Sequence, residues 1–539
     1  MATVLALTLF AAAYLRDLGL PGLYMDAINP EYLIPGILEP PQPVAYIVPG
    51  NYLGGRFPLL TGSLYHGSTQ LYAALPFLAI FGPNLITFRV FQLVVGAAIL
   101  ALVLRLSASG AADSKRAIAL GAAGALALDP SSVLALRTQA YSTIFPLLLL
   151  LGSVLLLQAW RDGRRPWVRL FASGILYGLA VFSYFIFAFF LPALLWLVLR
   201  RPHPGGDRRT WSAAFLWLAG SVVGYAPLIC GPLLMRSELG GWPELLAWLQ
   251  QTGAQLQITQ DTAGLLGRIG TVVADSGGVL AGEWPWLMIL GRSRLDLMDL
   301  AKAGILVIIP LVALVARRFW ARGEWRPLLV PIALLLSFHV GALAFGSRLD
   351  GHHYTAVLPL VYVAFAYGCA VLWPSGASVG GNSRTVSPDN VARAVLVIGA
   401  ISMVAVTNGL AQQRFHRDLV ATGGVRLYSD AIDRFAREVR RQDPAPAVYT
   451  PDWGFAMPMA FLTDAAPVRG VAKVRAIRKG TCRNIQQLVV FAGTGNEGKL
   501  WGIAGLARRP IERITTWSQR DGVPVFQVAR FAPTSNCTP

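Results

Sequence analysis

Residues 85–104 read LITFRVFQLVVGAAILALVL, an apolar run with one charged residue, Arg89, near its start. Twenty residues of α-helix extend about 30 Å, which matches the hydrocarbon thickness of a bilayer. Cations follow the run at once, beginning with Arg105. Because lysine and arginine are retained on the cytoplasmic side of a membrane, this stretch is predicted to be a transmembrane helix that ends in the cytoplasm.

Comparable apolar runs recur along the chain. Of its 539 residues, 55% are hydrophobic and 14% are charged, against about 25% charged in a soluble domain, which excludes a single water-soluble core. The sequence therefore predicts an α-helical polytopic membrane protein with about eleven transmembrane helices. The first run lacks a basic leader and a clear cleavage site, so it is expected to remain as an anchor. The spans are expected near residues 1–15, 85–104, 117–129, 143–159, 169–185, 186–199, 211–233, 301–316, 327–345, 353–374 and 391–410.

Clusters of lysine and arginine orient these helices. The clusters occur in alternate loops, within residues 105–116, 161–169, 200–209 and 317–326. This pattern is expected when those loops stay in the cytoplasm. The long loops 16–84 and 234–300 then face outward, as does the C-terminus. The expected location is the cytoplasmic (inner) membrane of a bacterium, with residues 1–411 forming the transmembrane domain.

Residues 412–539 differ in character from the rest of the chain. Residues 428–441 place apolar side chains at helical spacing among charges, and residues 447–450, 488–492 and 524–531 have strand patterns. This region is predicted to be a small extramembrane α/β domain on the outer side. Its excess positive charge indicates a solvated surface or, alternatively, attraction to anionic headgroups.

The four cysteines divide between the two domains. Cys230 and Cys369 lie inside predicted spans, where they are expected to be small apolar residues. Cys482 and Cys537 both fall in the outward domain, and a disulfide between them is predicted because that compartment is oxidising. No cysteine has zinc-type spacing, and no metal site or other cofactor is expected, although a divalent cation stays an open alternative.

The first outward loop carries two carboxylates soon after the first apolar run. They are Asp26 and Glu31, within residues 23–32, LYMDAINPEY. Acids at this place lie just outside the hydrocarbon, within reach of the phosphate of a lipid-linked substrate. The sequence therefore predicts an active-site loop. The alternatives are a cap or turn acid for Asp26 and a solvated side chain for Glu31.

Three further motifs follow in order. Residues 65–82, YHGSTQLYAALPFLAIFG, precede Arg89; residues 137–141, RTQAY, lead into a span; and residues 351–360, GHHYTAVLPL, open a late span. Their order resembles the GT-C superfamily of polyprenyl-phosphate-sugar-dependent glycosyltransferases, in the family-39-like group of protein mannosyltransferases and aminoarabinose transferases. The resemblance covers roughly residues 20–375. One departure is that Ala27 follows Asp26, where the family often has an acidic pair.

The resemblance implies an inverting transferase that moves a sugar from a polyprenyl-phosphate donor to a lipid, glycan or protein acceptor at the outer face. Asp26 matches the position of the base, with Glu31 and Asp129 as the other candidates. Pre-placed cations would stabilise the leaving phosphate. Each of these roles has an alternative. Arg89 instead snorkels from the start of its span, and His352 and His353 are ordinary interfacial residues. Asp129 instead ends a helix before Pro130. The donor phosphate-binding candidates are Arg56, Arg89, Arg137, Tyr141, Arg348, His352 and His353.

Other classes of function fit the sequence less well. The cytoplasmic loops contain few acids, which argues against a metal-dependent nucleotide-sugar site, and no nucleic-acid-binding pattern is present. A transporter or flippase of a lipid-linked saccharide would share the multi-span frame. It should also have ionisable residues deep in the spans and repeated halves, whereas these spans hold almost no ionisable residues at mid-depth and the halves do not repeat. A structural scaffold would make the acids of the first loop dispensable.

Overall fold

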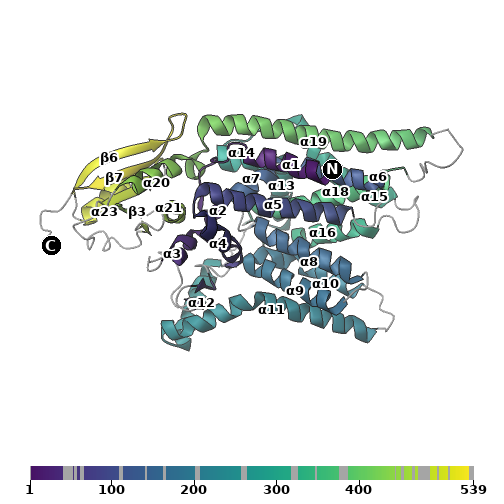
Figure 1. The fold of residues 1–539 in the computed structure, drawn as a ribbon, viewed down its shortest axis with the longest axis horizontal. Coiled ribbons are helices and arrows are strands. Elements are labelled where there is room, and N and C mark those ends of the chain that lie inside the picture. The colour runs from purple at the N-terminus through teal and green to yellow at the C-terminus, as the bar shows by residue number, and fades with distance from the viewer. Residues whose placement is uncertain are drawn as a thin grey trace.

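The protein is an elongated bundle of helices with a small mixed domain at one end (Figure 1). The computed structural model describes residues 2–39, 52–53, 57–60, 66–108, 113–139, 143–161, 166–200, 207–256, 264–316, 326–345, 349–374, 387–442, 445–450, 454–463, 468–470, 486–493, 497–507 and 510–532. The end of the bundle that carries the C-terminal domain is called the domain end below.

Each of the eleven expected spans coincides with a helical segment, as the apolar patterns predicted. Six of the described helices are long and apolar enough to cross a membrane singly. Helix α19 (Pro388–Thr422) continues beyond residue 411, the expected end of the transmembrane domain. The other ten spans correspond to α1 (Ala2–Leu15), α5 (Leu85–Ser107), α6 (Asp113–Ala127), α8 (Phe145–Arg161), α9 (Pro166–Ser183), η3 (Phe185–Phe190) with α10 (Leu191–Leu199), α11 (Asp207–Leu239), α15 (Leu297–Ala316), η5 (Arg326–Leu328) with α16 (Leu329–Phe345), and α18 (Leu358–Leu372).

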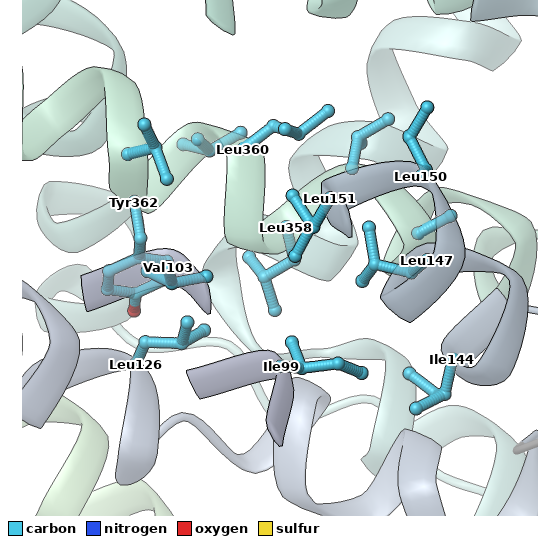
Figure 2. Close-up of a cluster of buried hydrophobic side chains, with 14 of the residues drawn as sticks. Ile99, Val103, Leu126, Ile144, Leu147, Leu150, Leu151, Leu358, Leu360 and Tyr362 are labelled. Atoms are coloured by element: carbon cyan, nitrogen blue, oxygen red, sulfur yellow. The ribbon is translucent and has the colours of Figure 1, made fainter. Parts of the chain in front are cut away.

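Helix α18 lies at the centre of the bundle. Within the span that contains it, 94% of the residues are buried, against 28% for the span that contains α16. Figure 2 shows why: Leu358 of α18 lies beside Leu151 of α8, and Tyr362 of α18 lies beside Val103 of α5 and Leu126 of α6. A helix that is apolar on every side is stable when other helices surround it, and this core sets the positions of the helix ends.

The domain end is built mainly from helical segments, with one pair of short strands. Helix α6 gives way to α7 (Pro130–Thr138) through a bend of 54°, at which Asp129 caps α7 and Pro130 occupies its first turn. Proline suits this place because it has no N–H to leave unpaired. The other segments here are α2 (Met25–Ile28), η1 (Glu31–Leu33), α3 (Ile34–Leu38), β1 (Tyr52–Leu53), β2 (Phe57–Pro58), α4 (Thr69–Phe81), α12 (Trp242–Leu256), α13 (Leu265–Ala281), α14 (Trp284–Leu290), α17 (Gly351–Tyr354) and η6 (Thr355–Val357).

The C-terminal domain contains a five-stranded mixed sheet in the order β4-β3-β5-β7-β6. Strand β3 pairs in parallel with β4 and β5, whereas β7 is antiparallel to β5 and β6. The three predicted strands and the amphipathic helix are confirmed, and β4 and β6 are additional. The elements are η7 (Arg426–Tyr428), α20 (Ala431–Arg441), β3 (Ala447–Thr450), α21 (Ala456–Leu462), β4 (Val468–Gly470), β5 (Gln486–Phe491), α23 (Glu497–Ala507), β6 (Ile511–Ser518) and β7 (Pro524–Phe531).

The C-terminal domain is packed directly on the first loop. Helix α21 lies against α2 and η1, and the ring of Phe461 lies 5.7 Å from that of Phe88 on α5. Segment η7 also contacts this loop, since Gly22 donates a backbone hydrogen bond to the carbonyl of Tyr428 at 2.8 Å. The loop that holds Asp26 and Glu31 is therefore covered by both domains.

Candidate active site at the domain end

Asp26 meets two residues that are remote in sequence. Its half-buried side chain lies on α2, where Oδ2 accepts a hydrogen bond from the amide of Gln139 at 3.4 Å. The same amide nitrogen donates to the hydroxyl of Tyr428, also at 3.4 Å. Gln139 caps the C-terminus of α7 and Tyr428 ends η7, so a bundle helix and the C-terminal domain both contribute to the surroundings of Asp26.

Two further acids, Asp350 and Asp275, lie in the same area as Tyr428. Burial raises the pKa of the Tyr428 phenol well above its usual value, and the nearby carboxylates of Asp26 and Asp350 raise it further. Burial also raises the pKa of Asp350, which directly precedes α17. The pKa of Asp275 on α13 is raised by burial and then by Asp350. The domain end therefore combines several carboxyl groups with a phenol that keeps its proton at neutral pH.

Glu31 is fully buried, so its interpretation as a solvated acid is wrong. Neither carboxyl oxygen has a hydrogen-bond partner among the described residues. Burial raises the pKa of Glu31 to about 8, although its own backbone N–H and the Gln70 side chain on α4 act in the opposite direction. Such a carboxyl is mostly protonated at neutral pH. It is a poor general base and a good hydrogen-bond donor.

Two histidines connect the first loop to the late span. The amide of Asn29 donates to Nε2 of His66 at 3.0 Å, and burial lowers the pKa of His66 to about 4, so this ring is neutral. His66 also forms an isolated backbone bridge with Tyr184. The Tyr184 hydroxyl lies 2.7 Å from Nε2 of His353. The rings of His352 and His353 have centroids 3.8 Å apart, and Nδ1 of His352 has no partner within the described part of the chain.

Arg89 and Arg137 hold the first loop through its backbone. Both side chains are buried. Arg89 donates to the carbonyls of Leu18 and Pro21. Arg137 donates to four carbonyls, those of Tyr14, Arg16, Asp17 and Leu20. Donors that serve carbonyls in this way are not available to a phosphate, so the geometry favours a structural role over the phosphate-binding role expected for both.

Asp129 is enclosed in a second polar cluster. Its Oδ1 accepts from the backbone N–H of Ser131 at 2.8 Å, and its Oδ2 accepts from the hydroxyl of Tyr362 at 2.8 Å. Nζ of Lys302 lies 3.6 Å away and donates to Asn408 at 3.0 Å. Asp129 and Lys302 are both fully buried. This geometry favours the capping role for Asp129, and no sequence pattern indicated its partner Lys302.

Some expectations fall outside the described residues. They concern Arg56, Tyr141, Arg348 and the disulfide between Cys482 and Cys537. Within the described ranges, no three or more side chains of His, Cys, Asp or Glu are grouped so that they could hold a metal ion.

Sequence comparison with known proteins finds no match, either to a protein-family model or to a curated protein. The fold does have matches among solved structures. ArnT from Cupriavidus metallidurans bound to undecaprenyl phosphate aligns with a TM-score of 0.59 at 13% identity, over 100% of this chain and 98% of that chain. The Archaeoglobus fulgidus oligosaccharyltransferase in complex with zinc and sulfate aligns with a TM-score of 0.51 at 12% identity, over 100% of this chain and 74% of that one. The chain has the GT-C fold.

The GT-C fold confirms the resemblance that the motifs indicated. Together with the apolar helices, it makes this chain a multi-pass membrane protein. The sequence did not indicate that Gln139 and Tyr428 lie beside Asp26, or that Asp350 lies near Tyr428. Gln139 and Asp350 did carry a signal, because Gln139 lies within residues 137–141 and Asp350 directly precedes residues 351–360, two of the motifs behind the resemblance.

Proposed function

We propose that this GT-C protein is a membrane glycosyltransferase that moves a monosaccharide from a polyprenyl-phosphate donor to a lipid, glycan or protein acceptor at the outer face of a bacterial cytoplasmic membrane. The observation that carries the proposal is the position of Asp26. Its half-buried carboxylate lies where the apolar helices end, and the Gln139 amide orients it. The match along the whole chain to ArnT, whose structure holds undecaprenyl phosphate, supports the same class of donor.

In this proposal Asp26 is the general base. The acceptor hydroxyl or amine attacks the anomeric carbon while Asp26 takes its proton, and the bond from that carbon to the phosphate oxygen breaks. The lipid phosphate leaves with the electron pair, and a single displacement of this kind inverts the anomeric centre. Asp26 suits the role better than Glu31, whose pKa of about 8 leaves it mostly protonated, or Asp129, whose oxygens are enclosed.

The leaving phosphate needs positive charge or hydrogen-bond donors close to it. Arg89 and Arg137 are engaged with carbonyls, so we assign this role to the His352 and His353 pair, with Arg56 and Arg348 as further candidates. His352 is the stronger member of the pair, because its Nδ1 has no partner within the described residues. His353 is held by Tyr184 and by the carbonyl of Asp350.

The test is transfer by purified protein in detergent, supplied with a panel of undecaprenyl-phosphate-linked hexoses and pentoses and with extracted envelope lipids and glycans. Release of undecaprenyl phosphate is measured by mass spectrometry, so the acceptor need not be known. Asp26→Asn keeps the size of the side chain and removes its basicity, and it should reduce the rate about 10²–10⁴-fold. Binding of the donor should persist.

Asp389→Asn is the matched control, because Asp389 lies in the first turn of α19, at the opposite end of that helix from the C-terminal domain. Its rate should equal that of the wild type. Near-normal transfer by Asp26→Asn would remove Asp26 as the base. Absence of transfer by the wild type with every donor, together with movement of a lipid-linked sugar across vesicle membranes, would favour the transporter alternative.

A further inference from the structure

Segment η7 of the C-terminal domain reaches into the surroundings of Asp26. Tyr428, at its end, is 4% exposed, and its ring packs in a tilted arrangement against that of Tyr24, two residues before Asp26, with 4.7 Å between the ring centroids. Its hydroxyl accepts from the Gln139 amide nitrogen that also donates to Asp26. An amide –NH₂ has two hydrogens, so one can serve the carboxylate and the other the phenol.

The backbone around Tyr428 lies unusually close to the first loop and to α14. A Cβ atom on Gly22 would lie 2.1 Å from the carbonyl oxygen of Ser429, and one on Gly424 would lie 2.1 Å from that of Tyr428. Arg426, two residues before Tyr428, has a φ of 49°, in the left-handed region that non-glycine residues seldom adopt. Val425 donates to the carbonyl of Ile289 on α14 at 2.9 Å. The first loop and α14 therefore both fix where the Tyr428 hydroxyl lies.

We propose that Tyr428 is a positioning residue of the transferase, through which the C-terminal domain completes the active site. The inference rests on the proposed function. With its hydroxyl in place, Tyr428 engages one N–H of Gln139 and leaves the other aimed at Asp26 Oδ2. Without it, the Gln139 amide loses one of the acceptors that orient it, and the orientation of the Asp26 carboxylate toward the proton of the acceptor is less well fixed. Small misplacement of a reacting group is costly because the reacting atoms must approach in a defined geometry.

Tyr428→Phe tests the inference because it removes the hydroxyl and keeps the ring that packs against Tyr24. We expect kcat to fall about tenfold while the KM for the polyprenyl-phosphate sugar stays within about twofold of the wild type. The acid limb of the pH–rate profile should move to higher pH, because the Asp26 carboxylate is less well supported by a hydrogen-bond donor. A merely structural residue would not move this limb.

A double-mutant cycle with Gln139→Leu shows whether Tyr428 acts through Gln139. The double variant should be no slower than Gln139→Leu alone, since the hydroxyl has nothing left to orient. Tyr449→Phe is the matched control, because it removes a buried hydroxyl from β3 of the same domain. Its kcat and pH profile should be those of the wild type.

Two results would overturn the inference and leave the proposed function standing. One is a kcat for Tyr428→Phe equal to that of the wild type; the other is losses from Tyr428→Phe and Gln139→Leu that multiply in the double variant. Wild-type protein that transfers no sugar from any donor would instead overturn the proposed function, and the inference with it.

Discussion

Asp129 and Asp26 lie at the same end of the helix bundle, yet their surroundings differ. Asp129 is fully buried and accepts from two backbone N–H groups and from Tyr362, with Lys302 as its counter-ion. Asp26 is half-buried, and the Gln139 amide reaches it at the long distance of 3.4 Å. The first carboxylate is thus tightly enclosed, whereas the second is held in place but accessible.

The two clusters also differ in the elements that build them. The Asp129 cluster joins four long helices, since its members come from the α6–α7 bend, α15, α18 and α19. The Asp26 cluster joins short segments and the C-terminal domain. A buried polar cluster with all its partners specifies how helices fit together, while a half-buried carboxylate stays within reach of a ligand. We infer that the Asp129 cluster stabilises the fold and the Asp26 cluster performs chemistry.

Lys302→Met should disrupt the Asp129 cluster, and its loss of stability should be the largest among these predictions. It leaves a buried carboxylate without its counter-ion, which costs about 3–5 kcal/mol of stability. Thermal unfolding in detergent measures the loss. The double variant Asp129→Asn/Lys302→Met should recover most of it, because no buried charge remains and Asn can still cap α7. Lys302→Met with unchanged stability but no transfer would reverse our division of roles.

Glu31→Gln should stabilise the protein at alkaline pH. The pKa of Glu31 is raised from 4.5 to about 8, so the folded state holds its proton more tightly than the unfolded state does. Below pH 4.5 both states are protonated and the site has no effect. As the pH rises from 4.5 to 8, stability should fall by up to roughly 1.4 kcal/mol per pH unit, a few kcal/mol in all.

The measurement for Glu31 is the free energy of unfolding of wild type and Glu31→Gln across pH 4 to 9. The variant should lack the decline attributed to Glu31, and the two curves should converge at the acidic end. Parallel curves throughout this range would mean that the Glu31 carboxyl has partners that keep it ionised.

Arg137→Lys should separate the structural role of this arginine from a phosphate-binding role. Lysine cannot reach four carbonyls with a planar fork, so stability should fall by about 2 kcal/mol. The Kd for an undecaprenyl-phosphate sugar should stay within about twofold, as measured by tryptophan fluorescence on the folded variant. Arg530→Lys, at a half-exposed pair with Glu512, is the control. A tenfold loss of donor affinity with normal stability would restore Arg137 to the phosphate site.

Tyr184→Phe should have the smallest effect on stability. It removes the hydroxyl that lies 2.7 Å from His353 and keeps the ring that stacks on it. We expect a loss of about 1 kcal/mol, the typical net contribution of one hydrogen bond. If His353 also faces the leaving phosphate, kcat should fall as well. A loss of stability alone would show that the Tyr184–His353 pair has a structural role only.

The spans could be predicted from the sequence because their cause is local. A run such as residues 85–104 is apolar whatever surrounds it, and its length alone matches a bilayer. The strands at 447–450 and 524–531 and the helix at 431–441 were readable for the same reason, since their side-chain periodicity is a property of a few neighbouring residues. Strand β6, which is exposed or half-exposed throughout and largely polar, had no such signature.

The roles of individual charges were not readable in this way. Arg137 has the composition of a phosphate ligand, but its position places backbone carbonyls within reach of its guanidinium. Lys302 and Asp129 are separated by 173 residues, and nothing near either one indicates the other. Glu31 sits beside Pro30 in a stretch that predicts exposure, yet the covering helices bury it.

The sequence by itself determined that this protein spans a membrane many times, that a small α/β domain follows, and that acids of the first loop lie at the ends of the helices. These conclusions depend on apolar length and on short-range periodicity. Only the tertiary structure decided which acid is accessible, which arginines are engaged, and that Tyr428 meets Gln139 beside Asp26. The reason is physical: hydrogen bonding and burial depend on groups hundreds of residues apart, which the packing of helices around α18 brings together.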